Sequence, residues 1–186
     1  MKKILSLICL LFLSGCVITS DLTYEGHDKG YIFMSYMIAD SHYAGDYKLY
    51  FENEQGQTSL FFYRKAGAWG KTKRDFDSDN FNGAVLYHKL KPGKYKLTKF
   101  EIERGNQKIH FAISPFDFNV YDNKATYLGE LKEFVGGTGF MEFNNQQKRD
   151  EKLVKEKLNI SNLIVIPEVP SKHLLKPKKL TEVKLY

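Results

Sequence analysis

The chain has 186 residues, with 28 Lys and Arg against 22 Asp and Glu, so its formal net charge is +6 at pH 7. Its two cysteines are Cys9 and Cys16, so residues 17–186 offer no disulfide, no thiolate metal site and no cysteine nucleophile. A chain of this length fits one domain with a substantial core. Aromatic residues make up 15% of the chain, which favours β-structure because their side chains suit pleated, half-buried surfaces.

The first 15 residues have the three parts of a secretory signal peptide. Lys2 and Lys3 form a positive region, Ile4–Leu13 is apolar apart from one serine, and Ser14-Gly15 supplies small residues before a cleavage site. The apolar run is about ten residues long, whereas a helix that crosses a bilayer needs roughly twenty. We therefore expect residues 1–15 to be a signal helix that is cleaved.

The tetrapeptide Leu13-Ser14-Gly15-Cys16 resembles the lipobox of bacterial lipoproteins. The resemblance implies cleavage before Cys16, a thioether-linked diacylglycerol on its sulfur, and a further acyl chain such as palmitate on its freed amine. Two or three acyl chains hold a protein firmly on a membrane. The next residue is Val17 rather than the Asp that tends to retain lipoproteins in the inner membrane, so the expected location is the outer membrane of a cell envelope.

Cleavage changes the composition of the mature chain. Removing 15 residues from 186 leaves 171, and the loss of Lys2 and Lys3 lowers the formal charge from +6 to +4. We expect a lipidated N-terminus and tether over residues 16–30, a β-domain over residues 31–167 and a basic tail over residues 168–186. The tether is short, so the domain should lie close to the membrane.

Short alternating segments predict a series of β-strands. Tyr31–Ile38 is an almost continuous apolar run, typical of a central strand that is buried on both faces. Tyr47–Phe51 and Ser59–Tyr63 flank the turn Glu54–Gln57, which predicts a hairpin.

The motif Lys91-Pro92-Gly93-Lys94 predicts a type II turn, because proline presets φ and glycine supplies a positive φ. Beyond it, a change of parity predicts a bulge near Thr98-Lys99. Several strands at this spacing indicate an all-β fold, an antiparallel β-sandwich. The remaining predicted strands are Ile109–Ile113, Phe116–Val120, Ala125–Leu131, Phe140–Phe143 and Leu163–Ile166.

One helix is predicted, over Gln147–Leu158. Leu153, Val154 and Leu158 form its apolar side, and Glu151 is followed four residues later by Lys155, the spacing of a helical ion pair. An asparagine at position 144 or 145 is expected to cap its start.

These features together resemble small uncharacterised bacterial lipoproteins with a prealbumin-like (transthyretin-like) β-sandwich. The resemblance rests on Leu90–Leu97 with its Pro-Gly-x-Tyr turn, on Tyr127-Leu128-Gly129-Glu130-Leu131, and on a charged helix followed by an apolar strand. It covers residues 31–167. It implies two packed antiparallel sheets at the cell envelope and transfers no catalytic residue.

A loop rich in aromatic and basic residues is the candidate for partner contact. Trp69 lies among five cations, Arg64, Lys65, Lys71, Lys73 and Arg74. Aromatic rings interleaved with cations can stack on sugars and pair with phosphates. In an envelope the expected partners are another envelope protein, a glycan or an anionic lipid, and not nucleic acid.

Asp75, Asp77 and Asp79 alternate like the first three ligands of a calcium loop. The pattern then fails, because Asn80 replaces the expected glycine and Leu86 stands where the bidentate glutamate should be. We therefore predict no metal site and no cofactor, with these three carboxylates as a weak candidate only.

Motifs for catalysis are missing from the sequence. There is no His-Glu-x-x-His and no Gly-x-Ser-x-Gly, and no Lys-Ser or Lys-Thr follows the glycine-rich segment 136–139. The expected function is therefore a non-catalytic binding or structural role. Two alternatives stay open: an accessory component of a secretion or appendage assembly, and an envelope enzyme whose site cannot be recognised in sequence.

Overall fold

The computed structural model describes residues 27–39, 45–65, 74–78, 81–104, 107–133 and 141–169. Within them, ten strands and one helix form a mostly β structure with two open sheets. The predicted signal peptide, most of the tether, the glycine-rich segment 136–139 and nearly all of the basic tail lie outside the described residues.

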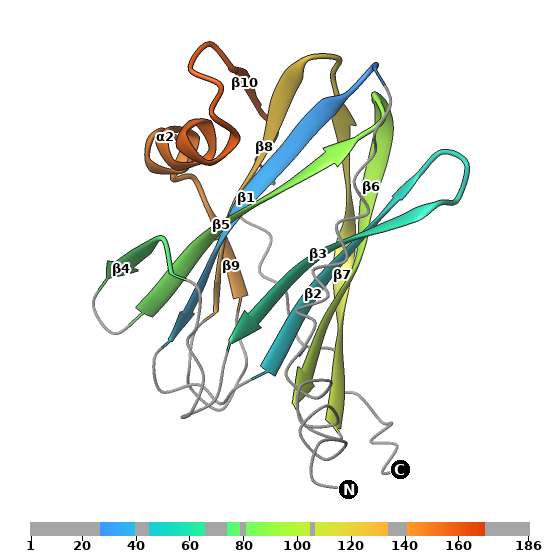
Figure 1. The fold of residues 1–186 in the computed structure, drawn as a ribbon. Helices are drawn as coiled ribbons and strands as arrows, with labels where there is room; N and C mark the ends of the chain where they lie inside the picture. The colour runs from blue at the N-terminus through green and yellow to red at the C-terminus, as the bar shows by residue number, and fades with distance from the viewer. Residues whose placement is uncertain are drawn as a thin grey trace, which may run out of the picture.

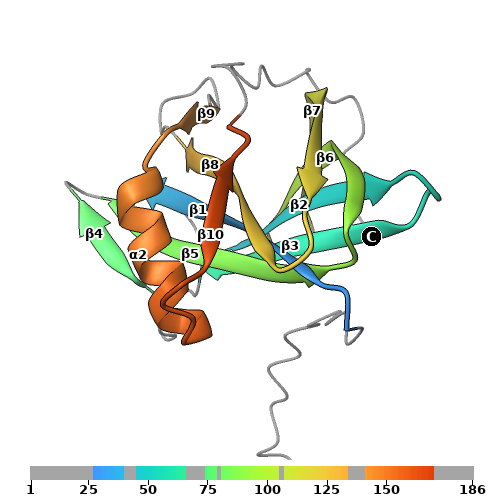
Figure 2. The ribbon, with the colours of Figure 1, turned by 90° about the horizontal axis from the view of Figure 1, so that it is seen from above.

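The first sheet, sheet A, has the order β10-β8-β1-β5-β4, with β9 beside β8. The second, sheet B, has the order β3-β2-β6-β7. Helix α2 (Gln147–Leu158) lies against the outer face of sheet A, so the layers run helix, sheet A, sheet B (Figure 1, Figure 2). The strands of sheet A are β1 (Gly30–Ala39), β4 (Phe76–Ser78), β5 (Phe81–Leu90), β8 (Lys124–Glu133), β9 (Met141–Asn144) and β10 (Ile164–Pro167). Those of sheet B are β2 (Gly45–Asn53), β3 (Thr58–Lys65), β6 (Gly93–Arg104) and β7 (Gln107–Val120).

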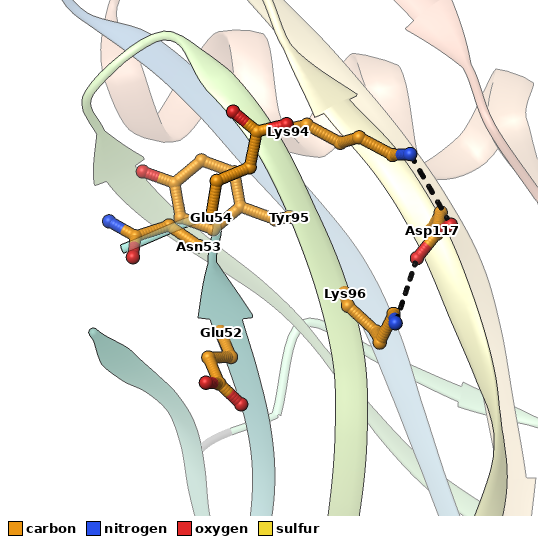
Figure 3. A pocket seen from close by; sticks show the side chains of 7 residues that line it. All are labelled: Glu52, Asn53, Glu54, Lys94, Tyr95, Lys96 and Asp117. Atoms are coloured by element: carbon orange, nitrogen blue, oxygen red, sulfur yellow. Dashed lines mark ion pairs between the residues drawn. The ribbon is translucent and has the colours of Figure 1, made fainter. Parts of the chain in front are cut away.

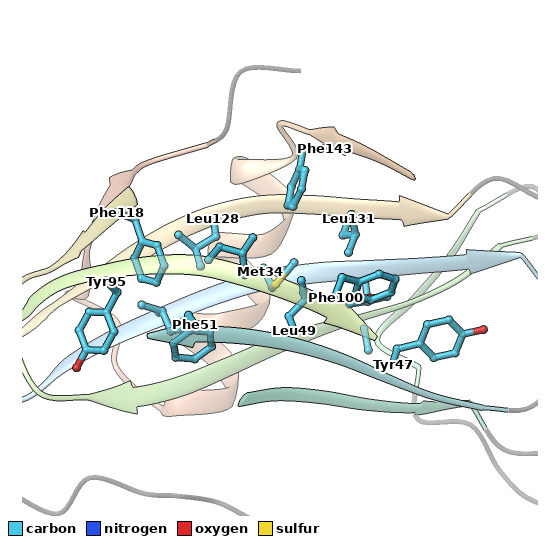
Figure 4. Packing of buried hydrophobic residues seen from close by; sticks show 14 of the residues in the cluster. Met34, Tyr47, Leu49, Phe51, Tyr95, Phe100, Phe118, Leu128, Leu131 and Phe143 are labelled. Carbon is cyan, nitrogen blue, oxygen red and sulfur yellow. The ribbon is translucent and has the colours of Figure 1, made fainter. Parts of the chain in front are cut away.

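Aromatic side chains fill the space between the two sheets (Figure 4). Phe51 is fully buried there, with its ring centroid 6.3 Å from that of Tyr95, 6.0 Å from that of Phe118 and 6.1 Å from that of His88. His88 belongs to sheet A and the other rings to sheet B, so this cluster joins the layers. Many of the aromatic residues in the described ranges are thus buried in this core.

The central strand agrees with its prediction. Ile32, Met34 and Tyr36 of β1 face the core between the sheets, whereas Tyr31 and Phe33 face α2. Both faces of β1 are buried because a sheet covers one and a helix covers the other. The continuous apolar run in the sequence reflects this double burial.

Both predicted chain reversals are present, but the second differs in its turn type. Strands β2 and β3 pair as an antiparallel hairpin whose turn is ordered by Asn53, since its Oδ1 accepts hydrogen bonds from the N–H groups of Gln55 and Gln57 at 3.0 and 2.8 Å. Between β5 and β6, Gly93 has the predicted positive φ, but its value is 153° and not the ~80° of a type II turn, so the predicted turn type is wrong.

The predicted bulge near Thr98 is confirmed. Tyr50 pairs with Lys99 and Phe51 pairs with Leu97, so Thr98 is the extra residue of β6. The register between β6 and β7 shifts at the same place. The two segments predicted on either side of Pro115 therefore form one long strand, β7, with an irregularity opposite the bulge.

The prediction of an entirely antiparallel sandwich is wrong for two strand pairs. Strand β8 runs parallel to β1 on one side and parallel to β10 on the other. Helix α2 lies between β9 and β10 in the chain and provides the crossover that a parallel return requires. Apolar alternation within one strand shows which face is buried, but it contains no information on the direction of the neighbouring strand.

Helix α2 has the predicted bounds, but its start differs from the prediction. The N-cap residue is Gln146, and its side chain makes no capping bond. Instead the Asn145 side chain, one position earlier, accepts the N–H of Gln147 at 3.0 Å. Of the helices in the described ranges, none has the length and apolar character needed to span a bilayer.

Candidate functional site

A buried polar cluster lies between α2 and the outer face of sheet A. It consists of Ser35 from β1, Tyr127 and Glu130 from β8, and Arg149 and Asp150 from the first turn of α2. Ser35, Glu130 and Asp150 are almost completely excluded from solvent. Such groups are costly to bury unless their hydrogen bonds are made, so this cluster is the first place to look for a function.

Asp150 is the centre of the polar cluster. Its Oδ2 accepts hydrogen bonds from Ser35 Oγ at 2.6 Å and from the Tyr127 hydroxyl at 2.8 Å. Its Oδ1 accepts one from Arg149 Nε at 2.8 Å. Burial and the charge of Asp150 raise the pKa of Tyr127 well above its ordinary value, so the hydroxyl keeps its proton and remains a donor.

The guanidinium of Arg149 joins the remaining members. It donates to Glu130 Oε2 at 2.6 Å and to Ser35 Oγ at 2.9 Å, and its Cζ lies 3.7 Å from the centroid of the Phe76 ring. Burial opposes its charge, but hydrogen bonding to Glu130 and the charge of Asp150 outweigh burial, and the pKa of Arg149 is raised. A Cβ at Gly83 would overlap the Phe76 ring, so the stack of ring and guanidinium needs glycine beneath it.

A bulge in β8 brings Glu130 into the polar cluster. Phe33 pairs with Tyr127 but Ser35 pairs with Glu130, so β8 has an extra residue between them. Gly129, at φ 96°, occupies this irregularity. Simple alternation predicts that Leu131 and Tyr127 lie on the same face of β8. Because of the bulge, Leu131 instead lies in the core between the sheets, whereas Tyr127 faces α2.

The polar cluster attaches α2 to sheet A. Ser35 donates a hydrogen bond to Asp150, but both residues are fully buried between α2 and sheet A, where a substrate has no access. Within the described ranges, no group of three His, Cys, Asp or Glu side chains is placed to hold a metal ion. Apart from the Arg149–Asp150 bond within α2, the polar bonds described above join α2 to sheet A.

A second polar contact holds α2 near its C-terminal end. Lys157 forms an ion pair with Asp75 and also donates to the carbonyl oxygen of Val85 at 2.7 Å. The same Asp75 carboxylate accepts the N–H of Val85 at 2.7 Å. The ion pair thus satisfies both backbone groups that Val85 presents at the edge of β5, in the way that a neighbouring strand would.

A comparable contact is present at the other side of the sandwich. Glu168, directly after β10, accepts the N–H of Asn119 at 2.8 Å, and the Thr126 hydroxyl donates to the Asn119 carbonyl. Asn119 lies on β7, the edge strand of sheet B. Charged groups that occupy edge positions hinder the addition of another strand, so both contacts protect the sheets from edge-to-edge association.

Replacing Lys157 by Gln should destabilise the protein by about 1–3 kcal/mol, because Asp75 and the Val85 carbonyl lose their donor in a partly buried place. Hydrogen exchange measured by mass spectrometry should show faster exchange in α2. The matched control is Lys155→Gln on the same helix, which removes a more exposed ion pair with Glu151 worth about 0.3–0.5 kcal/mol. Equal effects of the two variants would contradict the role given to Lys157.

The outer face of sheet B has a network of opposite charges. Glu101 is buried and lies 2.7 Å from Lys99, and Tyr50 donates to it at 3.3 Å. Burial and the charge of Glu101 raise the pKa of Tyr50 to about 12. The adjacent Glu103 is bonded to Lys48 and, at 2.6 Å, to Lys108.

The Glu103 carboxyl should titrate far below its ordinary range. Hydrogen bonds from Lys108 and Lys48 lower its pKa from 4.5 to about 2. Because the folded-state pKa is depressed, the stabilisation is present above pH 4.5 and is lost as the pH falls towards 2. Carbon-detected NMR titration of the carboxyl resonance would measure this, and Lys108→Gln should move the midpoint upwards. A midpoint near 4.5 in the wild type would be incompatible with these contacts.

A shallow pocket of about 250 Å³ lies where the β2–β3 turn approaches β6 and β7 (Figure 3). Its charged groups oppose each other: Lys94 and Lys96 lie 3.5 and 3.9 Å from the two oxygens of Asp117, while two glutamates come from the end of β2 and its turn. The lining residues are Glu52, Asn53, Glu54, Lys94, Tyr95, Lys96 and Asp117. Because the lining carries both positive and negative side chains, the pocket favours no single class of ligand.

The structure tests little of the predicted contact loop. Trp69, Lys71 and Lys73 lie outside the described residues, and Arg64 lies in β3, where only the backbone is described. Arg74 is exposed at the start of the segment that leads into β4. Phe76, an aromatic residue of the same loop, lies under Arg149 and packs against the apolar cluster below α2, where it stabilises the fold.

The carboxylates of the weak calcium candidate do not act together in the described part of the structure. Asp75 is bonded to Lys157 and Val85. Asp77 lies in β4 without a described side chain, and Asp79 lies outside the described residues.

Sequence reasoning missed the polar cluster, although two signals for it were present. Ser35 interrupts the apolar run of β1, and Asp150 precedes the buried Val154 by four residues, which places it on the same face of α2. A charged residue on the buried face of a predicted helix requires a partner.

No protein-family model matches the chain, and no curated protein matches it in sequence. Among solved structures, a leucine-rich repeat protein from Bacteroides thetaiotaomicron is similar at 13% identity and a TM-score of 0.34, over 58% of this chain and 14% of that one. A candidate cell adhesion protein from Parabacteroides distasonis is similar at 8% identity and a TM-score of 0.32, over 59% of this chain and 36% of that one. Similarities at this level assign neither a fold family nor a function to the chain.

Proposed function

We propose that this protein is a lipid-anchored lipoprotein of the cell envelope whose β-domain has a non-catalytic binding or structural role. The observation that carries the proposal is the tetrapeptide Leu13-Ser14-Gly15-Cys16 behind a positive region and a short apolar run. Val17 after the cysteine favours the outer membrane. The prealbumin-like sandwich suggested by the turn at Pro92-Gly93 is part of the same proposal.

The described part of the fold supports a binding or structural role over a catalytic one. Ser35 and Asp150, the nucleophile and carboxylate that lie closest to a catalytic arrangement, are buried beneath α2 and fully hydrogen-bonded. Catalysis requires reactive groups that a substrate can reach. The polar cluster instead stabilises a rigid helix-covered sheet, which is a suitable scaffold for surface contacts.

Substitution of the lipidation site tests the anchor directly. Cys16→Ser should abolish incorporation of labelled palmitate and release the domain from the membrane fraction, because serine cannot form the thioether. Cys9→Ser is the matched control: Cys9 lies within the cleaved signal, so this variant should be labelled and fractionate like the wild type. Lipid labelling or membrane retention of the Cys16→Ser protein would contradict the proposal.

A further inference from the structure

At one end of the sandwich, the start of β1 lies beside the β5–β6 turn and the β7–β8 turn. Gly30, the first residue of β1, pairs with Leu90 at the end of β5. The carbonyl of Lys29 accepts the N–H of Asn123, in the turn between β7 and β8, at 2.8 Å. This end is uppermost in Figure 1, where β1 begins, β5 ends and β8 begins. The described residues begin at this end, with residue 27 three positions before Gly30.

The sheet A half of this end has an excess of lysines. Lys29, Lys89, Lys91 and Lys124 come from three chain segments that the pairing of Gly30 and the bond to Asn123 bring together. The nearby exposed carboxylates are Asp28 and Asp122, and Glu168 is used by its bonds to Asn119 and Tyr121. On sheet B, by contrast, Lys94 and Lys96 face Asp117 and the glutamates of the shallow pocket.

Tyrosines accompany these lysines. Tyr87 on β5 is 42% exposed, one of two large hydrophobic side chains in the described ranges that remain exposed. The ammonium of Lys124 lies 5.8 Å from the ring centroid of Tyr121. Lysine stems and tyrosine rings have an apolar body and a polar tip, the combination that suits the boundary between lipid headgroups and water.

We infer that this surface, formed by Lys29, Tyr87, Lys89, Lys91 and Lys124, is the face that lies on anionic lipid headgroups of the anchoring membrane. The inference rests on the proposed lipid anchor and adds an orientation to it. Cationic side chains near a membrane surface are attracted by its negative potential within a Debye length.

The length of the tether favours the same orientation. From Cys16 to Gly30 the chain can span at most ~50 Å when fully extended. The opposite end of the sandwich lies a whole strand away, and the 12 residues of β6 extend over roughly 40 Å. The tether therefore reaches the bilayer easily from the lysine-rich end, whereas docking through the far end would require almost its full extension.

Site-specific fluorescence on the lipidated full chain tests the orientation. Because Cys16 is acylated and no other cysteine follows it, an introduced cysteine is a unique thiol. Lys91→Cys places a dye at the inferred membrane face, and Lys108→Cys places the same dye near the far end of the β6–β7 hairpin. Each protein is reconstituted in vesicles of phosphatidylcholine with phosphatidylglycerol, or of phosphatidylcholine alone, with a headgroup-labelled quenching lipid.

We expect strong quenching at position 91 and weak quenching at position 108 in the anionic vesicles, with the difference reduced in the neutral ones. Replacing Lys29, Lys89 and Lys124 by Gln in the Lys91→Cys protein should lower the ratio of docked to undocked domains by roughly fivefold per lysine. Circular dichroism of that variant confirms that it is folded.

Equal quenching at the two positions, or quenching that does not respond to anionic lipid, would overturn the inferred orientation while leaving the anchor intact. Failure of the protein to float with vesicles of either composition would instead contradict the lipid anchor, and the docking surface with it. The two failures are therefore distinguishable in one set of samples.

Discussion

Asp150→Ala is expected to lower the free energy of unfolding by about 3–5 kcal/mol, the typical cost of removing one partner from a buried charged pair. The substitution leaves the hydroxyls of Ser35 and Tyr127 and the guanidinium of Arg149 without their shared acceptor. Arg149 would then have only Glu130 to balance its charge. Urea unfolding of the mature protein in detergent, followed by circular dichroism, measures the loss.

Two companion variants make this result specific. Glu156→Ala changes an exposed carboxylate on the same helix and should alter stability by less than about 0.5 kcal/mol. Asp150→Asn keeps the size of the side chain but replaces one acceptor oxygen by a donor facing other donors, so it should also be strongly destabilising. If Asp150→Ala unfolds at the same urea concentration as Glu156→Ala, the polar cluster does not hold the helix.

Phe51→Ala should destabilise the protein by about 3–5 kcal/mol through a cavity between the two sheets. Its ring is fully buried and contacts Tyr95, Phe118 and His88. Loss of the ring therefore weakens packing within sheet B and contact with sheet A together. Thermal unfolding and urea unfolding should both show the effect.

The control for this cavity is an aromatic residue outside the core. Tyr87→Ala removes a ring that is 42% exposed and should cost far less than Phe51→Ala. Phe51→Leu, which refills most of the space, should recover much of the stability. Equal losses for Phe51→Ala and Tyr87→Ala would show that the aromatic core is not the main source of stability.

The two expected results concern different layers of the molecule. The core between the sheets is apolar and aromatic, and it supplies most of the burial. The layer between sheet A and α2 combines a smaller apolar cluster with the polar cluster and the Lys157 ion pair. An apolar surface gives stability without a fixed orientation, whereas paired charges require one geometry, so the polar contacts are expected to determine where α2 lies on the sheet.

Much of the local structure could be predicted because it depends on neighbouring residues. The continuous run Tyr31–Ile38 indicated a doubly buried strand, Pro92-Gly93 indicated a turn, and the spacing of Leu153, Val154 and Leu158 indicated the helix. Each of these signals lies within about a dozen residues, and the structure confirms the element in each case. The bulge at Thr98 was also visible, because a change of parity within one strand is a local event.

The candidate site and the sheet topology could not be predicted in the same way. Ser35 and Asp150 are 115 residues apart, and no local periodicity connects them. The side of β8 on which Glu130 lies depends on the irregularity at Gly129. The ion pair of Asp75 depends on Lys157, which is far along the chain. These contacts form only when the strands have paired and α2 has packed on sheet A.

The sequence by itself thus determined the local elements, the aromatic composition of the core and the resemblance of Leu13-Ser14-Gly15-Cys16 to a lipobox, because each depends on residue type and short spacing. Only the tertiary structure decided the parallel pairing of β8, the polar cluster beneath α2 and the ion pair that covers the edge of β5. The physical reason is that a strand's own alternation specifies which face is buried, whereas its partner, its direction and its buried charges are chosen by the global packing.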